Sequence, residues 1–379
     1  MRHTVTLDFA SALYLGLSHP SRYVPPWSAL TLGTPAAIRE PQLARDVAAG
    51  VARLVGADDA VIGTSTLHIA LDLFPLLAPR GATIYTERSL YPIAMWGIDR
   101  ARSLGARVRS FPTHDPVALR AMLERDAPFS HPPVVVCDGL CPSCGRVAPL
   151  AAYARLAHQF GGRLVIDDTQ ALGVLGTRDD DNPYGRGGGG SLRHLGVRDP
   201  RIVIIASLAK GFGAPLAVLA TDAALTARFR SQAPTREHCS PPSIPTLLAA
   251  DRALRINRSV GDRIRDRLAS LVARFRAPLA ATGLLATHWL FPVQPLRLPP
   301  NVDAVAMYRA LVAAGIQAVP TRNHDGATML TFVITAAHDE HAIDIAAARV
   351  RAVLDRATHG SHSMAFSHDH RFALPRRLG

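Results

Sequence analysis

Seven short apolar segments alternate with helical segments between residues 60 and 221, and this alternation limits the possible folds more than any other feature of the chain. One of the intervening segments, residues 149–162, carries apolar side chains at helical spacing and ends in two glycines. Strands that alternate with helices form a mostly parallel sheet with helices on both faces, which is an α/β architecture. The predicted strands are residues 60–63, 82–86, 107–111, 133–138, 163–168, 201–207 and 216–221.

The pattern changes near Ser240, where the proline-rich run CSPPSIP precedes long helical segments and a second group of apolar runs. A chain of 379 residues is long enough for more than one core, so we expect a smaller α+β domain after the sheet domain. The last residues are polar and unpatterned, which is typical of a mobile tail. The predicted parts are an N-terminal segment (1–45), a large sheet domain (46–235), a small C-terminal domain (236–357) and the tail (358–379).

The composition is that of a globular protein, because hydrophobic residues make up 48% of the chain and charged residues only 19%. The longest apolar stretch, residues 202–220, is interrupted by a lysine, two glycines and a proline. It therefore predicts two buried strands around a loop and no membrane span. The N-terminus lacks the continuous apolar core of a secretory leader, which predicts a cytoplasmic protein.

The formal net charge of +12 raises the question of a nucleic-acid partner. The arginines are scattered among acidic residues along helical segments such as residues 251–268, a pattern typical of a solvated face. No basic stretch carries the interleaved aromatic residues that would stack on bases. We therefore predict no nucleic-acid partner.

Lys210 is the only lysine among the 42 basic residues of the chain. Arginine stands wherever a plain positive charge is sufficient, so position 210 requires a property that arginine lacks. A guanidinium stays protonated at any usable pH, whereas a buried primary amine can lose its proton and add to an aldehyde. Survival of one lysine by chance is the alternative interpretation, and the residues around Lys210 decide against it.

Chemically useful side chains follow three of the predicted strands. The turn of Thr64, Ser65 and Thr66 follows the first strand and leads into a helix, whose N-terminus can bind a phosphate. Asp167 stands at the end of another strand, and Lys210 follows a third. Ligands of open α/β sheets bind beyond the carboxyl ends of the strands, so we expect these groups to lie together. They suit an aldehyde cofactor that has a phosphate and a ring nitrogen that must stay protonated.

Six segments, in the same order and at similar spacing, resemble motifs of the α-oxoamine synthase family, which are pyridoxal-phosphate (PLP) enzymes of fold type I. The run DGLCPSCGRVAPL, residues 138–150, matches the family pattern DGxxxxxGxxAPL without a gap. The resemblance extends from about Asp8 to Leu354. The other five segments are residues 9–20, 111–115, 164–176, 207–213 and 335–338.

The resemblance implies the aspartate-aminotransferase fold, with a mostly parallel seven-stranded sheet and a smaller α+β C-terminal domain, and it implies PLP as the cofactor. Lys210 then binds PLP as a Schiff base and moves protons at the substrate carbon. Asp167 corresponds to the aspartate that pairs with the pyridine nitrogen and keeps the ring an electron sink. Ser207 and the turn of Thr64, Ser65 and Thr66 correspond to phosphate ligands. Tyr91 corresponds to the aromatic group that stacks on the ring.

Three positions depart from the family pattern. Gln170 replaces a histidine that contacts the phenolic oxygen of PLP, and a glutamine can donate a hydrogen bond but cannot act as an acid. Thr331 replaces the arginine that binds the substrate carboxylate, and Ala12 replaces a substrate-side asparagine. Bidentate binding of a carboxylate requires a guanidinium. Either another arginine, such as Arg322, binds the carboxylate, or the amine substrate differs from glycine, alanine and serine.

The function implied by the resemblance is decarboxylative condensation of an amino acid with an acyl thioester of coenzyme A or an acyl carrier protein, carried out by a homodimer. A second hypothesis is a different PLP reaction on an unusual amine in a specialised biosynthetic pathway, namely transamination, elimination or another carbon–carbon bond formation. Thr331 and Ala12 favour this second hypothesis. A third is a non-catalytic partner subunit, and the retained Lys210 argues against it.

Two further patterns resemble ligand-binding motifs but have simpler structural interpretations. Cys137, Cys141 and Cys144 have the C-x3-C-x2-C spacing of some iron–sulfur sites, but the same segment matches the family motif, so we predict no metal site. The glycine-rich run at residues 185–190 follows an acidic stretch, and no strand leads directly into it. We therefore predict a mobile loop near the active site there, and not a phosphate-binding loop.

Overall fold

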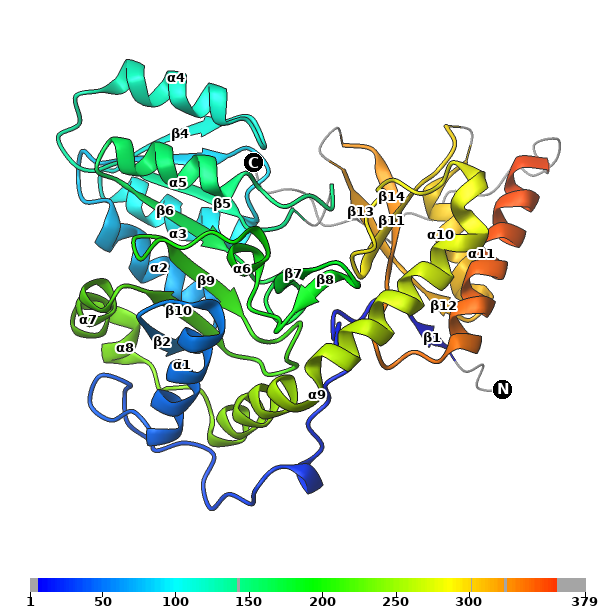
Figure 1. The fold of residues 1–379 in the computed structure, drawn as a ribbon, viewed down its shortest axis with the longest axis horizontal. Helices are drawn as coiled ribbons and strands as arrows, with labels where there is room; N and C mark the ends of the chain where they lie inside the picture. Colours follow the sequence, from blue (N-terminus) through cyan, green and yellow to red (C-terminus); the bar gives the residue numbers. More distant parts are fainter. Residues whose placement is uncertain (1–5, 142–143, 301, 324–325, 360–379) are drawn as a thin grey trace.

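The computed structural model describes residues 6–141, 144–300, 302–323 and 326–359. Its largest unit is a seven-stranded sheet with the strand order β2-β10-β9-β6-β5-β3-β4 (Figure 1). Strand β10 is antiparallel to both of its neighbours, and the other pairs are parallel. All seven predicted strands are confirmed, namely β2 (Asp59–Gly63), β3 (Thr83–Glu87), β4 (Arg107–Phe111), β5 (Val134–Asp138), β6 (Arg163–Asp167), β9 (Val203–Ser207) and β10 (Ala217–Thr221).

Helices cover both faces of this sheet, as the alternation of segments predicts. Successive side chains of a strand point to opposite faces, so Leu164 and Ile166 of β6 pack in one buried cluster and Val165 packs in another. Because both faces of the sheet are covered, inner strands such as β5 and β9 are nearly continuous apolar runs, whereas the edge strand β4 is largely exposed. The first cluster includes residues of α1 (Gln42–Val55), α4 (Pro116–Asp126), α5 (Leu150–Gln159), α6 (Ser191–Leu195) and α9 (Ile244–Arg276); the second includes residues of α2 (Thr66–Leu77), α3 (Pro92–Ser103) and α7 (Ala223–Gln232).

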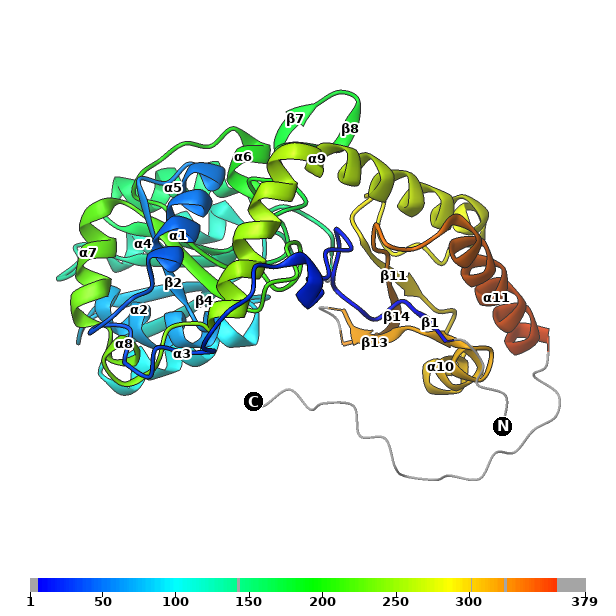
Figure 2. The same ribbon diagram turned by 90° about the horizontal axis from the view of Figure 1, so that it is seen from below.

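A second, smaller group of elements follows the long helix α9, which extends from the large sheet to this group in both views (Figure 2). An antiparallel three-stranded sheet has the order β11-β14-β13, and two helices accompany it, so the expected α+β character is confirmed. The elements are β11 (Val293–Arg297), α10 (Ala304–Ala313), β13 (Val319–Arg322), β14 (Thr328–Val333) and α11 (Glu340–His359).

The N-terminal segment contributes to this smaller group. Strand β1 (Leu7–Asp8) pairs in parallel with β12 (Ile316–Gln317), and the amide of Val333 donates a hydrogen bond to the carbonyl of Phe9 at 2.8 Å. The chain then crosses to the large sheet before α1 begins (Figure 2). The exact boundaries of the four predicted parts stay a prediction, and most of the predicted tail, residues 360–379, lies outside the described residues.

The glycine-rich run differs from the mobile loop that the sequence predicts. The run begins in β8 (Asn182–Arg186), which forms a hairpin with β7 (Thr177–Asp179), and the following Gly188, Gly189 and Gly190 are buried. Helix α9 holds it through Asn257, whose Nδ2 donates to the carbonyl of Gly187 at 2.9 Å. A Cβ atom at Gly190 would stand 2.0 Å from Oδ2 of Asp168, so the glycines are there to allow close packing.

No helix in the described part of the chain combines the length and the apolar character that crossing a membrane requires.

Candidate functional site

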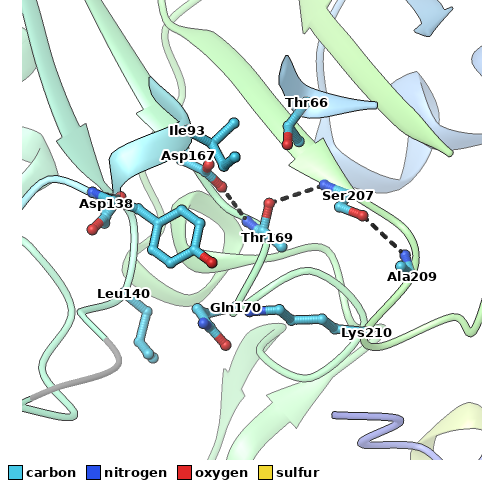
Figure 3. A pocket seen from close by; sticks show the side chains of 11 residues that line it. Thr66, Ile93, Asp138, Leu140, Asp167, Thr169, Gln170, Ser207, Ala209 and Lys210 are labelled. Atoms are coloured by element: carbon cyan, nitrogen blue, oxygen red, sulfur yellow. Dashed lines mark hydrogen bonds between the residues drawn. The ribbon is translucent and has the colours of Figure 1, made fainter. Parts of the chain in front are cut away.

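A pocket lies at the carboxyl ends of β5, β6 and β9, which is the place that open α/β sheets use for ligands (Figure 3). Residues that start α2 and α3 close its other side. The lining residues are Thr66, Tyr91, Ile93, Asp138, Leu140, Asp167, Thr169, Gln170, Ser207, Ala209 and Lys210. Six residues predicted for the site therefore meet here: Thr66, Tyr91, Asp167, Gln170, Ser207 and Lys210.

Lys210 stands in the loop after β9, where burial lowers the pKa of its ammonium group while the charges of Asp167 and Asp138 oppose that shift. A lowered pKa makes the free amine, which is the nucleophilic form, easier to reach near neutral pH. The Nζ atom lies 5.9 Å from the centroid of the Tyr91 ring.

The loop around Lys210 depends on a glycine. Gly213 has a φ angle of +64°, and a Cβ atom there would stand 2.0 Å from the carbonyl oxygen of Leu17. The ring of His19 is 2.8 Å from the carbonyl oxygen of Phe212, so the N-terminal segment contacts the loop in a second place. The backbone after Lys210 is thus packed tightly against that segment.

Two carboxyl groups face the lysine across the pocket. Asp138 and Asp167 are register partners on β5 and β6, so their side chains leave the sheet next to each other. Burial raises the pKa of both carboxyl groups. Asp167 accepts a hydrogen bond from the amide of Thr169 at 2.9 Å, whereas the buried Oδ2 of Asp138 has no partner among the described residues.

This set of groups fits PLP. The pocket offers an amine for the aldehyde, hydroxyl groups for a phosphate, and more carboxyl groups than its single lysine can neutralise. A protonated ring nitrogen is a cationic donor of the kind that such a buried carboxylate binds. The buried Oδ2 of Asp138 has no hydrogen-bond partner among the described residues, which indicates that a bound molecule supplies the donor.

Asp168 has a different role from its neighbour Asp167. Its Oδ1 accepts a hydrogen bond from the hydroxyl of Ser191 at 2.5 Å, and its Oδ2 accepts one from the amide of Ser191 at 2.9 Å. Burial raises the pKa of Asp168 to about 7 in spite of these bonds. Asp168 is not among the lining residues, so it connects β6 to the start of α6 and leaves the pocket to Asp167.

The predicted phosphate ligands are divided between two places. Thr66 and Ser207 line the pocket, and the amide of Ser207 donates to Oγ1 of Thr169 at 3.0 Å. Ser65 caps α2 by accepting from the amide of His68, and the hydroxyl of Thr64 donates to the carbonyl of Ser240 at 3.4 Å. Thr64 and Ser65 are therefore not lining residues, and their contact with a phosphate stays a prediction.

Tyr91, the residue predicted to stack on the cofactor ring, and Gln170 also line the pocket. Tyr91 is the N-cap residue of α3 and is 47% exposed. The carboxamide oxygen of Gln170 accepts a hydrogen bond from the hydroxyl of Tyr14 at 2.5 Å. Stacking of Tyr91 on a cofactor ring stays a prediction.

The residues predicted for the substrate are not lining residues of this pocket. Thr331 is buried in β14, and its hydroxyl is 2.7 Å from that of Thr321 on the paired strand β13. Arg322, at the end of β13, is exposed, and its guanidinium donates to the carbonyl of Gly326 at 3.3 Å. A substrate contact by either residue stays a prediction.

Sequence reasoning did not single out Asp138 or Tyr14. Asp138 ends a predicted strand just as Asp167 does, and this shared position is a signal that could have identified it. Tyr14 lies in the matched segment 9–20, but nothing in the sequence indicates a contact with a residue 156 positions away.

Comparisons with known proteins identify the family of the chain. The family described as aminotransferase class I and II matches residues 33–350. The 8-amino-7-oxononanoate synthase of Burkholderia thailandensis is 35% identical over 69% of this chain, which spans 64% of that enzyme's length. The 8-amino-7-oxononanoate synthase of Marinobacter nauticus is 32% identical over 77% of this chain and 72% of its own length.

The fold is shared with a serine palmitoyltransferase from S. paucimobilis, solved with PLP and myriocin bound, which superposes with a TM-score of 0.81. The sequence identity is 16%, and the superposition covers 93% of this chain and 88% of the other. This likeness confirms the fold, and the family match and the two sequence relatives confirm the resemblance found in the motifs. The chain therefore belongs to the class I and II aminotransferase family and, within it, to the α-oxoamine synthases, which are PLP enzymes of fold type I.

Proposed function

We propose that this protein condenses an amino acid with an acyl thioester in a PLP-dependent reaction that forms a carbon–carbon bond and releases carbon dioxide. The observation that carries the proposal is the meeting of the only lysine, Lys210, with Asp167 and Ser207 in one pocket of an α-oxoamine synthase fold. The named relatives favour condensation over transamination, elimination or a non-catalytic role.

PLP supplies the electron sink for the carbanion that forms at the substrate carbon. Lys210 would hold the cofactor through its amine and would move a proton at that carbon, for which its lowered pKa is suited. Asp167 would pair with the ring nitrogen and keep it protonated. Thr66 and Ser207, with Thr64 and Ser65 nearby, bind the phosphate at the start of α2.

The amine substrate is not simple glycine or alanine in this proposal. Thr331 cannot provide a guanidinium, and its hydroxyl already contacts that of Thr321. Each missing charge-assisted hydrogen bond to a carboxylate weakens binding by about 1.5–3 kcal/mol. A larger or differently charged part of the amine must therefore supply binding free energy, unless Arg322 moves to the carboxylate. The acyl donor is a thioester of coenzyme A or of an acyl carrier protein.

We also propose that the protein is a cytoplasmic homodimer. Large apolar side chains are exposed in the segment before α1 and on α3 of the described chain. They include Trp27, Leu30 and Ile38 in that segment and Trp96 on α3, and a second copy would cover such residues.

The experiment that tests the function begins with borohydride reduction of the protein after addition of PLP. Because the chain has one lysine, the label is expected on Lys210 alone, and peptide mass mapping identifies it. A panel of amino acids and larger amines, each with an acyl-CoA or an acyl carrier protein thioester, then reports release of thiol and carbon dioxide. Release of thiol together with carbon dioxide, only when both the thioester and a larger amino acid are present, supports the proposal. A protein that takes up PLP but releases no thiol with any pair contradicts condensation.

A further inference from the structure

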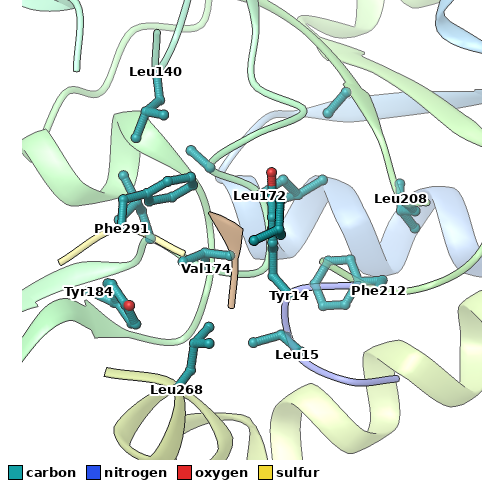
Figure 4. Packing of buried hydrophobic residues seen from close by; sticks show 14 of the residues in the cluster. Tyr14, Leu15, Leu140, Leu172, Val174, Tyr184, Leu208, Phe212, Leu268 and Phe291 are labelled. Carbon is teal, nitrogen blue, oxygen red and sulfur yellow. The ribbon is translucent and has the colours of Figure 1, made fainter. Parts of the chain in front are cut away.

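The contact between Tyr14 and Gln170 joins the N-terminal segment to the pocket. Tyr14 is 1% exposed and lies in the buried cluster with Leu15, Leu172 and Phe212 (Figure 4). Its hydroxyl donates to Oε1 of Gln170 at 2.5 Å. Gln170 itself lines the pocket beside Lys210 (Figure 3).

Tyr14 is held firmly at both ends. Its ring packs edge-on against Phe291, with the centroids 5.7 Å apart and the planes at 71°. Its carbonyl accepts a hydrogen bond from the amide of Ala336 at 2.9 Å. Burial raises the pKa of the phenol, so the hydroxyl keeps its proton and stays a donor. Tyr14 is thus a fixed donor that needs an acceptor.

A glutamine carboxamide is planar, and its acceptor oxygen and donor nitrogen point in different directions from Cδ within that plane. Because Tyr14 binds Oε1, the other side, Nε2, is left for the pocket. Among the described residues none accepts a hydrogen bond from Nε2 of Gln170. Without Tyr14, the carboxamide could rotate by half a turn and present its oxygen to the pocket, which already contains the carboxyl groups of Asp138 and Asp167.

We propose that Tyr14 is a positioning residue, which orients the carboxamide of Gln170 so that its N–H groups point into the pocket and donate to the ring oxygen of bound PLP. The inference rests on the proposed function for the identity of the acceptor. A carboxamide does not titrate, so this donor keeps its protons over the whole working pH range. Histidine, which stands at this position in the family pattern, titrates near neutral pH.

The first test uses the apoprotein and does not depend on PLP. The side-chain amide signals of Gln170 in a ¹⁵N spectrum are identified by their absence in Gln170→Ala. In Tyr14→Phe these signals are expected to shift and broaden, because the carboxamide samples two orientations. Tyr184→Phe is the matched control, since Tyr184 lies in the same buried cluster and donates to the carbonyl of Leu290, and it should leave the signals unchanged. Unchanged signals in Tyr14→Phe would overturn the inference.

The second test measures PLP affinity and the visible absorbance band of the loaded protein. Loss of one hydrogen bond weakens binding about fivefold, so Tyr14→Phe and Gln170→Ala should each raise the dissociation constant of PLP by about that factor. The double variant should match Gln170→Ala, because Tyr14 acts only through Gln170. Tyr14→Phe and Gln170→Ala should also shift the band in the same direction, and Tyr184→Phe should not shift it.

The outcomes separate the inference from the proposed function. If Tyr14→Phe raises the dissociation constant of PLP by the same factor in the wild type and in Gln170→Ala, Tyr14 has only a structural role. This result would overturn the inference. A wild-type protein that takes up no PLP contradicts the proposed function and the choice of acceptor. The apoprotein spectra still decide, in that case, whether Tyr14 orients Gln170.

Discussion

The two sheets of this protein contribute differently to the proposed chemistry. The seven-stranded sheet brings an amine, two carboxyl groups and several hydroxyls together at one edge, in agreement with the family pattern. The three-stranded sheet carries Thr331 where that pattern has an arginine, and its hydroxyl contacts that of Thr321. We therefore propose that the site retains the chemistry of the cofactor and differs from the family pattern in how it recognises the amine.

The difference follows from charge and burial. At the large sheet, burial lowers the pKa of Lys210 and raises those of Asp138 and Asp167. Perturbed pKa values of this kind are typical of functional sites. At the small sheet, the hydroxyls of Thr321 and Thr331 form a hydrogen bond with each other. Both groups are neutral, so they provide no charge that could bind a substrate carboxylate. We therefore expect substitutions at the large sheet to change the reaction and those at the small sheet to change little.

The largest effect is expected from Lys210→Arg. This variant keeps the positive charge but loses the amine that adds to the aldehyde, so turnover should fall by about 10³-fold or more. Borohydride reduction should then leave no cofactor on the chain, as measured by intact mass. Lys210→Ala with added methylamine is the companion experiment, because a free amine can replace part of the proton transfer. Substantial activity of Lys210→Arg without added amine would contradict the role of Lys210.

A smaller but clear loss is expected from Asp167→Asn. Without the carboxylate the ring nitrogen is no longer kept protonated, and turnover should fall by more than about tenfold, which corresponds to roughly 1.4 kcal/mol of barrier. Asp168→Asn is the matched control, because Asp168 contacts Ser191 and does not line the pocket. Steady-state kinetics on both variants decide. A larger loss from Asp168→Asn would show that the two aspartates have exchanged roles.

The sequence was sufficient for the large sheet because its pattern is local. Most of the seven strands are short apolar runs next to helical segments, and the positions of Asp167 and Lys210 in the pocket follow from their places at and after strand ends. Close packing is not local. The burial of Gly188 against α9 depends on segments that meet only in the folded chain. The same is true of the contact of Tyr14 with Gln170.

The next expected effect is on stability and its pH dependence. Folding raises the pKa of Asp168 from its ordinary value of 3.8 to about 7, so the folded state retains a proton that the unfolded state has already released over this range. The contribution of Asp168 to stability is therefore full below about pH 4 and is lost as the pH rises toward 7. Asp168→Asn removes this dependence. Thermal unfolding between pH 4 and 7 should show the variant gaining relative to the wild type as pH increases, and parallel curves would contradict the assignment.

The smallest effect is expected from Arg322→Ala, which tests whether Arg322 has replaced the missing arginine. Arg322 is exposed, and its guanidinium donates to the carbonyl of Gly326. Because exposed charges contribute little to binding, Arg322→Ala should change the KM of the preferred amine less than about threefold. The measurement is a pair of steady-state series, one with an amine that has a carboxylate and one with the same amine as its methyl ester. If Arg322 does bind the carboxylate, the KM for the first amine should rise tenfold or more, since a charge-assisted hydrogen bond contributes about 1.5–3 kcal/mol, while the KM for the ester stays constant. That result would show that Arg322 of β13 binds the substrate carboxylate in place of the arginine that the family has at position 331. The two sheets would then both retain their family functions, and only the position of the carboxylate-binding arginine would differ.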